Sequence, residues 1–218
     1  MSANAPRVAL IHALPHSVAP INEALAREWP QAFRMNLMDD SLSADLAAGG
    51  ALDAAMHERF QRLAQYAVDC GSNAILFTCS AFGPCIEAVA RQHAPLPVLK
   101  PNEAMIDDAI AMGTRVGLVA TFAPTLDSMR PEFPAGVPLE CALAEGALAA
   151  LNDGDTQRHD ALIGEAALAL ARRGCGVIAL AQFSMARARS HVARQTGLPV
   201  LTTVDSAVIA LKRRLGAA

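Results

Sequence analysis

The chain has 218 residues, enough for a well-buried core and intermediate between one large domain and two small ones. Its formal net charge of −3 comes from 18 basic and 21 acidic residues scattered along the sequence, which argues against a nucleic-acid partner. Apolar residues make up 53%, but no uninterrupted apolar run approaches the roughly 18 residues that a membrane span needs.

The N-terminal segment and the cysteines indicate the cellular compartment. The segment MSANAPRVALIHAL passes directly into a strand-like stretch, without the apolar region and cleavage site of a secretory signal. Five cysteines without a CxxC pair favour neither a disulfide framework nor a structural zinc site. We therefore expect a cytoplasmic protein with reduced thiols and no bound metal, which binds neither membranes nor nucleic acid.

In chain order, apolar stretches typical of strands alternate with amphipathic stretches typical of helices. Strands are expected at about 8–14, 33–38, 74–79, 97–100, 115–121, 138–143, 176–181 and 199–202. The two clearest helices cover 51–70 and about 155–173, and a glycine follows each of them. This alternation predicts an α/β protein whose mainly parallel sheets are covered by helices on both faces.

An internal repeat relates the two halves of the sequence residue by residue. It aligns ILFTCSAFGPCIEAVARQ with IALAQFSMARARSHVARQ without a gap, so that Cys79 matches Gln182. It also aligns VALIHALPHS with VGLVATFAPT, so that Ser17 matches Thr125. We therefore expect two doubly wound halves, each with a four-stranded sheet; closure of all eight strands into a single barrel is the alternative.

The repeat also predicts the domain boundaries and the place of the active site. The first lobe is expected to comprise residues 1–99 plus 203–218, and the second lobe residues 100–202. In doubly wound sheets, ligands bind at the carboxyl ends of the strands. Each half has a strand-to-helix turn after its first and third strands, and we expect these turns to meet in a cleft between two pseudo-symmetric domains.

Two residues in these turns are candidates for proton transfer. Cys79 ends the apolar run NAILFTC and precedes a helix, whose free N–H groups and dipole favour a thiolate. The sequence predicts a reactive thiol with a lowered pKa, and a small buried residue is the alternative. His12 ends the first strand; it is either a second base, since histidine titrates near neutral pH, or a hydrogen-bonded structural residue.

Small polar groups in the same turns are typical of a site for a carboxylate or a developing enolate. No glycine-rich phosphate loop or dinucleotide motif follows the first strand. Ser17 and Thr125 are suited to ligand binding, to capping a helix, or to both. The residues expected to bind substrate are Ser17, Ser80, Ala81, Thr121, Thr125, Gln182 and Phe183.

Three short motifs resemble the aspartate/glutamate/hydantoin racemase superfamily, which includes arylmalonate decarboxylase and maleate isomerase. They are FTCS around Cys79, RVGLVATFAPTL with Thr121, and PVLTTVDSAV near the C-terminus, and the resemblance covers nearly the whole chain. It implies a pseudo-symmetric two-domain fold, a reaction without metal or cofactor, and a homo-oligomer. It also implies that hydroxyls and backbone amides hold a small carboxylate substrate.

One departure from the superfamily pattern affects the expected reaction. Its racemases use two cysteines, one from each half, because inversion of a carbon needs a base on one face and an acid on the other. Here Gln182 takes the second position, and a neutral amide cannot serve as acid or base. The resemblance implies an isomerase in which Cys79 moves a proton at the α-carbon of a small carboxylate. The alternatives are a single-cysteine decarboxylase of the arylmalonate type and a small-acid binding module without turnover.

Overall fold

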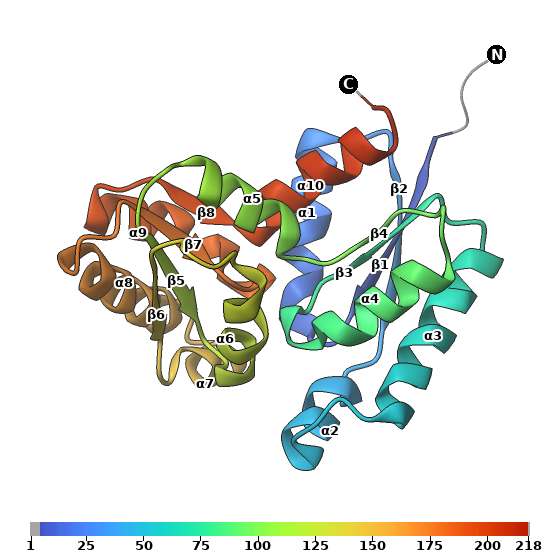
Figure 1. Ribbon diagram of the computed structural model, residues 1–218, viewed down its shortest axis with the longest axis horizontal. Helices are drawn as coiled ribbons and strands as arrows, with labels where there is room; N and C mark the ends of the chain where they lie inside the picture. Colours follow the sequence, from blue (N-terminus) through green and yellow to red (C-terminus); the bar gives the residue numbers. More distant parts are fainter. Residues whose placement is uncertain (1–4, 218) are drawn as a thin grey trace. The chain divides into compact units, whose positions relative to one another are not determined.

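The structure is a computed structural model that describes residues 5–217 (Figure 1). The chain forms two compact units: unit 1 covers the chain up to Pro101 together with the segment from Ala207 on, and unit 2 covers Asn102–Ser206. Each unit holds one four-stranded parallel sheet, in the order β2-β1-β3-β4 in unit 1 and β6-β5-β7-β8 in unit 2. The two sheets confirm the predicted α/β fold class and exclude the single barrel.

Unit 1 contains the sheet whose strand ends carry Cys79 and His12. Its strands are β1 (Arg7–His12), β2 (Phe33–Met38), β3 (Ala74–Phe77) and β4 (Val98–Leu99). Its helices are α1 (Val18–Glu28), α2 (Ser41–Gly49), α3 (Ala54–Asp69), α4 (Gly83–Gln92) and the C-terminal part of α10 (Thr203–Arg214), with the short 3-10 turns η1 (Pro15–Ser17) and η2 (Ser80–Phe82). The central strands β1 and β3 are buried along almost their whole length, whereas the edge strand β2 exposes side chains to solvent.

Unit 2 repeats this arrangement with its own sheet and helices. Its strands are β5 (Val116–Ala120), β6 (Leu139–Leu143), β7 (Val177–Leu180) and β8 (Val200–Thr202). Its helices are α5 (Glu103–Ala111), α6 (Ala123–Met129), α7 (Ala147–Asn152), α8 (Thr156–Arg172) and α9 (Arg189–Thr196), with η3 (Arg130–Glu132) and η4 (Phe183–Ala188). The helix α8 approaches β5 closely at Gly117, where a Cβ atom would lie 3.1 Å from the Cβ of Leu170.

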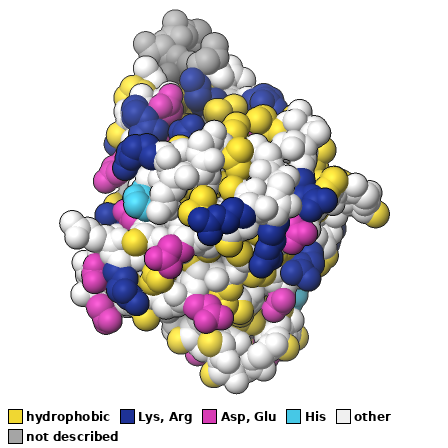
Figure 2. All heavy atoms as spheres, turned by 90° about the vertical axis from the view of Figure 1, so that its left-hand side faces the viewer, with side chains coloured by type: hydrophobic (Ala, Val, Ile, Leu, Met, Phe, Trp, Pro, Cys, Tyr) yellow, Lys and Arg dark blue, Asp and Glu magenta, His cyan; other side chains and the backbone are white. Residues whose placement is uncertain are grey.

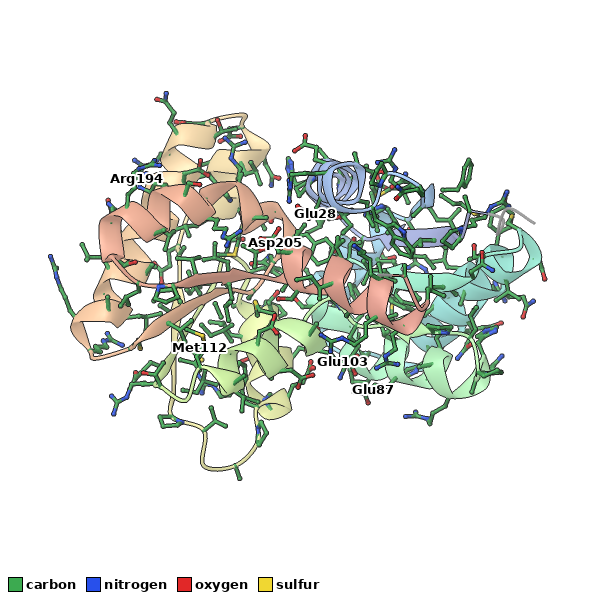
Figure 3. All side chains as sticks on the ribbon, turned by 90° about the horizontal axis from the view of Figure 1, so that it is seen from above. Glu28, Glu87, Glu103, Met112, Arg194 and Asp205 are labelled. Carbon is green, nitrogen blue, oxygen red and sulfur yellow. The ribbon has the colours of Figure 1, made fainter. Side chains whose placement is uncertain are left out.

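Acidic side chains form hydrogen bonds at the starts of α3 and α10. The helix predicted over 51–70 starts at Ala54, because the Asp53 side chain accepts a hydrogen bond from the Met56 backbone N–H (2.8 Å). Near the start of α10, labelled in Figure 3, Asp205 accepts hydrogen bonds from the Thr202 hydroxyl (2.8 Å) and from Arg189 (3.0 Å). Acidic side chains in a first helical turn also interact favourably with the helix dipole.

The surface mixes charged side chains of both signs, as Figure 2 shows for one face. Among the described residues, no helix combines the length and the apolar character that a membrane span requires. Within residues 5–217, no three His, Cys, Asp or Glu side chains gather in a way that could hold a metal ion.

An aromatic cluster in unit 1 supports the turn that follows β3. The Phe60 side chain on α3 is 2% exposed, and its ring centroid lies 5.2 Å from that of Phe77 and 5.0 Å from that of Phe82. Phe77 is the last residue of β3 and Phe82 the last residue of η2. The cluster therefore fixes both ends of the short segment that contains Cys79.

Replacing the central ring of this cluster tests its contribution to stability. Phe60→Ala is expected to lower the free energy of unfolding by about 3–5 kcal/mol, because it leaves a cavity and removes two aromatic contacts. Urea denaturation measures this change. The control Tyr66→Ala, on the same helix but 56% exposed, should change stability by less than about 0.5 kcal/mol. Equal losses in both variants would contradict the structural role of Phe60.

Candidate active site

Cys79 lies between β3 and η2, where the backbone is still extended (φ −125°, ψ 118°). The residue is partly buried. Beside it lies a small pocket with no room for a water molecule. Mostly apolar residues line the pocket: Ile11, His12, Ala13, Leu42, Phe60, Phe77 and Cys79.

Burial raises the pKa of the Cys79 thiol to about 11. A hydrogen bond from the Ala81 backbone N–H and one with the Ser43 hydroxyl act in the opposite direction but do not outweigh the loss of water. The predicted lowering of this pKa is therefore wrong. The reason is that Cys79 lies among mostly apolar side chains, whose desolvating effect exceeds that of the two hydrogen bonds. At neutral pH the thiol is protonated.

His12 is the last residue of β1, and its side chain is fully buried. Both ring nitrogens have hydrogen-bond partners within unit 1. Nε2 lies 2.9 Å from Asn36 Oδ1, while Nδ1 lies 2.9 Å from Thr78 Oγ1 and 3.0 Å from Ser17 Oγ. Burial lowers the pKa of His12, and the hydrogen bond with Asn36 offsets part of this effect. The imidazole is therefore neutral at neutral pH.

A chain of amide groups determines which nitrogen of His12 carries the hydrogen. Asn22 Nδ2 donates to the Val18 carbonyl (2.8 Å), which fixes the orientation of the Asn22 side chain. The same Nδ2 donates to Asn36 Oδ1 (2.8 Å), so that this oxygen faces His12. Because a carbonyl oxygen only accepts, His12 Nε2 must be the donor and Nδ1 the acceptor.

The hydrogen bonds of the two hydroxyl groups beside His12 can be assigned in the same way. Ser17 donates to the Leu14 carbonyl (2.7 Å), so Thr78 is the donor available to His12 Nδ1 (2.9 Å), a shorter contact than the one from Thr78 to the Ile11 carbonyl (3.4 Å). Both ring nitrogens of His12 are thus engaged with side chains of unit 1. The arrangement holds the hydroxyls of Ser17 and Thr78 in fixed positions at the ends of two neighbouring strands.

In unit 2, Gln182 and Thr121 form a second pair of turn residues. Gln182 Oε1 accepts hydrogen bonds from the Thr121 backbone N–H (2.6 Å) and from its hydroxyl (3.0 Å). Gln182 follows β7 and is 8% exposed. Since its carbonyl group is held by Thr121, the NH₂ group at the other side of the amide points away from Thr121 with two N–H donors.

The other predicted residues are buried in the same turns. Ser80 and Ala81 form the start of η2 and are 3% and 5% exposed. Thr125 lies in the first turn of α6, and Phe183 begins η4; each is 1% exposed. Unit 1 thus brings together His12, Ser17, Ser80, Ala81 and Cys79, and unit 2 brings together Thr121 and Gln182.

Three neighbours of the site were not assigned a role from the sequence. Asn36 carries a weak signal, because asparagine is disfavoured in strands and this one lies in β2. Thr78 directly precedes Cys79, but its contact with His12 depends on the pairing of β1 with β3. Ser43 lies on α2, a helix without a periodic apolar pattern that would reveal it.

Comparisons with known proteins extend these observations. The family model described as Asp/Glu/Hydantoin racemase matches residues 16–211. Comparison with curated proteins gives no match. A glutamate racemase from Bacillus anthracis is similar in structure, with a TM-score of 0.75, 12% identity, and coverage of 98% of this chain and 83% of that one.

Two further solved structures share the fold over nearly the full chain. An allantoin racemase from Klebsiella pneumoniae has a TM-score of 0.71 and 20% identity, with coverage of 98% of this chain and 89% of that one. A glycine-to-cysteine mutant of arylmalonate decarboxylase, in a sulfate-associated form, has a TM-score of 0.68 and 18% identity. That match covers 97% of this chain and 94% of the decarboxylase.

The lowered pKa of His12 predicts a change in stability with pH. Below about pH 6.5 the unfolded chain binds a proton at His12 that the folded chain does not, so stability falls as the pH decreases toward the folded-state pKa. His12→Gln removes this contribution. Denaturation at a series of pH values should show the wild type losing stability faster than the variant on acidification. Parallel curves would contradict the assignment of a buried, neutral imidazole.

Proposed function

The chain belongs to the Asp/Glu/hydantoin racemase family, and on this basis we propose that it is an isomerase that moves a proton at the α-carbon of a small carboxylate through Cys79. The observation that carries this proposal is the position of the thiol at the end of β3, in an apolar turn beside the Ala81 N–H. The reaction proposed needs no metal ion or cofactor, since the thiol moves the proton and hydrogen-bond donors stabilise the enolate.

The reaction begins when the thiolate form of Cys79 removes the α-proton, and the electron pair of the C–H bond passes into the carboxylate as an enediolate. The S–H group so formed returns a proton to that carbon and again becomes a thiolate; burial raises the pKa of Cys79, which makes the thiolate a strong base. Hydrogen bonds from Ala81 and Ser43 stabilise that thiolate, which can remove a proton in the reverse direction. The mostly apolar residues that line the pocket also limit protonation of the intermediate by water, which would occur without control of stereochemistry.

Of the residues expected to bind substrate, Gln182 is supported best. Its two N–H donors suit a carboxylate or enolate oxygen, and Thr121 holds the amide in one orientation. In this proposal His12 is a positioning residue, because it fixes Thr78 and Ser17 instead of contacting the reacting carbon.

A decarboxylase with a single thiol is the second candidate. Two observations favour it: Cys79 is protonated, and the residue that matches it in unit 2 is Gln182. The bond from the α-carbon to the lost carboxylate would break, and its electron pair would remain on the carbon as an enediolate. The Cys79 proton would then pass to that carbon, and the thiolate would regain a proton from water.

Incubation of candidate carboxylic acids in deuterium oxide tests the proposed function. The wild type should incorporate deuterium at the α-carbon, and Cys79→Ala should lower this rate by about 10²–10⁴-fold, the usual contribution of general acid–base catalysis. The control Cys70→Ala, at the C-cap of α3, should keep the wild-type rate. Proton NMR and mass spectrometry measure the exchange.

The other outcomes separate the candidate functions. Release of carbon dioxide with uptake of one deuteron would identify the decarboxylase. If no acid shows exchange, inversion or loss of carbon dioxide, the enzyme proposal is overturned. Binding of an acid with equal affinity to the wild type and to Cys79→Ala would then identify a binding module.

The identity of residue 182 provides a further prediction. Gln182→Cys supplies a thiol at the position that the repeat matches to Cys79. With a second acid–base group, more of the α-carbons that exchange their proton should also invert their configuration. The ratio of inversion to exchange, followed by chiral chromatography and NMR, should rise by about tenfold or more. Gln182→Ser is the matched control, because it removes the amide without adding an acid or base. An unchanged ratio in Gln182→Cys would contradict the assignment of position 182 as the place of the second acid–base group.

A further inference from the structure

We propose that helix α2 positions the Cys79 thiol: the Ser43 hydroxyl on α2 holds the S–H group, and Arg59 on α3 holds α2 in place. Its effect on turnover depends on the function proposed above. The arrangement itself concerns only the thiol and its neighbours in unit 1.

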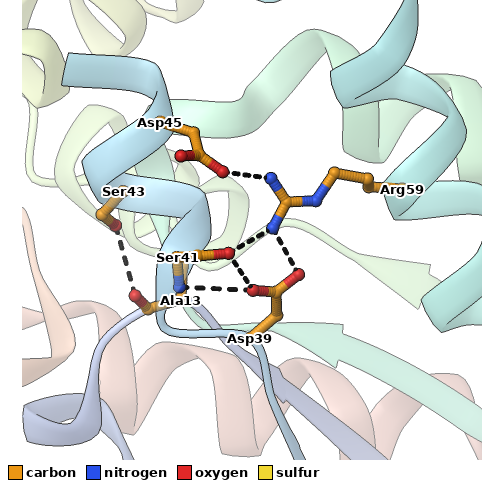
Figure 4. Close-up of polar contacts among 6 residues, drawn as sticks. All are labelled: Ala13, Asp39, Ser41, Ser43, Asp45 and Arg59. Carbon is orange, nitrogen blue, oxygen red and sulfur yellow. Dashed lines mark hydrogen bonds and ion pairs between the residues drawn. The ribbon is translucent and has the colours of Figure 1, made fainter. Parts of the chain in front are cut away.

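Ser43 has the contacts that such a role requires. Its hydroxyl donates to the Ala13 carbonyl (3.3 Å), as Figure 4 shows, and lies within hydrogen-bonding reach of the Cys79 sulfur. A hydroxyl has one hydrogen to donate and two lone pairs that accept. While it donates to Ala13, Ser43 can accept from the protonated thiol; when the thiol ionises, the same hydroxyl can turn and donate to the thiolate.

The residue before Ser43 shows that α2 forms part of the wall around the sulfur. Leu42 is 1% exposed and lines the pocket that also contains Ala13 and Cys79. Two consecutive residues of α2 thus serve the thiol in different ways, one by excluding water and one by hydrogen bonding. A shift of α2 would change both the hydration and the orientation of Cys79.

The position of α2 depends on an ion-pair network centred on Arg59 (Figure 4). Arg59 Nη2 lies 2.6 Å from Asp39 Oδ2 and donates to the Ser41 hydroxyl (2.6 Å), while Nη1 lies 2.5 Å from Asp45 Oδ2. Ser41 in turn donates to Asp39 Oδ1 (2.7 Å). Ser41 and Asp45 lie on α2 and Asp39 lies just before it, so one guanidinium contacts the helix at two residues and the segment that leads into it at a third.

The same network is tied to the strand that carries His12. The Asp39 backbone N–H donates to the His12 carbonyl (3.0 Å), which places the start of α2 beside the end of β1. Burial raises the pKa of the Asp39 carboxyl, but hydrogen bonds from Ser41 and Arg59 outweigh burial and bring the pKa below its usual value. The Asp39 carboxylate is therefore charged, as the ion pair with Arg59 requires.

Packing alone gives α2 little stability. The helix has nine residues, of which only Leu42 and Leu46 have buried apolar side chains. Gly50, in the left-handed conformation (φ 69°), follows its last residue as the C-cap. Short helices depend on tertiary contacts because helix nucleation is unfavourable. The Arg59 network supplies such contacts, and it does so on the segment that contains Ser43.

The rate at which iodoacetamide alkylates Cys79, measured by mass spectrometry of the peptide, tests the role of Ser43. Because the thiolate is the reactive form, Ser43→Ala should slow alkylation about threefold to tenfold and move the midpoint of its pH profile upward. Ser43→Thr keeps the hydroxyl and should restore the wild-type midpoint. Ser190→Ala, an exposed serine on α9, is the control. An unchanged midpoint in Ser43→Ala, or a threonine variant that behaves like alanine, would overturn the role of Ser43.

A double-mutant cycle tests the role of Arg59. If Arg59 holds Ser43 beside the sulfur, Ser43→Ala should change the alkylation rate by less than about twofold in an Arg59→Gln background. In an Arg62→Gln background the full effect should remain, since Arg62 lies on the same helix but pairs with Glu58. Equal effects of Ser43→Ala in both backgrounds would overturn the role of Arg59.

These measurements need no substrate, so their outcome is independent of the proposed function. Failure of the deuterium-exchange experiment would leave the alkylation results interpretable. Conversely, alkylation that is insensitive to Ser43 would overturn the role of α2 and leave catalysis by Cys79 in place.

Discussion

Burial of the Cys79 thiol is the constraint on which the proposed chemistry depends. Leu42 and the aromatic cluster around Phe60 leave the sulfur in an apolar pocket, and this burial keeps the thiol protonated at neutral pH. A protonated thiol can give a proton to a carbanion, and the hydrogen bonds beside it stabilise the thiolate that results. The proposed reaction therefore follows from packing around one atom as well as from the identity of the residue.

The two units use matching positions for different purposes. In unit 2, Thr121 after β5 contacts Gln182 after β7 through two hydrogen bonds. In unit 1, the matching residues are Ala13 and Cys79, and both lie beside the Ser43 hydroxyl of α2. At this position unit 1 thus carries a thiol, and unit 2 carries an amide that Thr121 holds in one orientation. The two sheets share their strand order, while the side chains at the ends of matching strands differ.

The sequence predicted the fold better than the state of the groups at the strand ends. Strands buried on both faces are continuous apolar runs, so β1, β3, β5 and β7 were recognisable, and the repeat indicated two sheets. The pKa of Cys79 was not predictable, because it depends on Leu42 and Ser43 on a helix that has no clear periodicity. The hydrogen bonding of His12 likewise depends on Asn36, which the pairing of β1 with β2 brings near it.

The most direct test of the central claim follows the alkylation of Cys79 and the loss of α-carbon deuterium exchange in the same sample. Mass spectrometry gives the fraction of unmodified Cys79, and NMR gives the remaining exchange activity. If Cys79 is the group that moves the proton, the two quantities will decline together at one rate, and a bound substrate will slow both equally. Exchange that persists after Cys79 is completely alkylated would contradict the account.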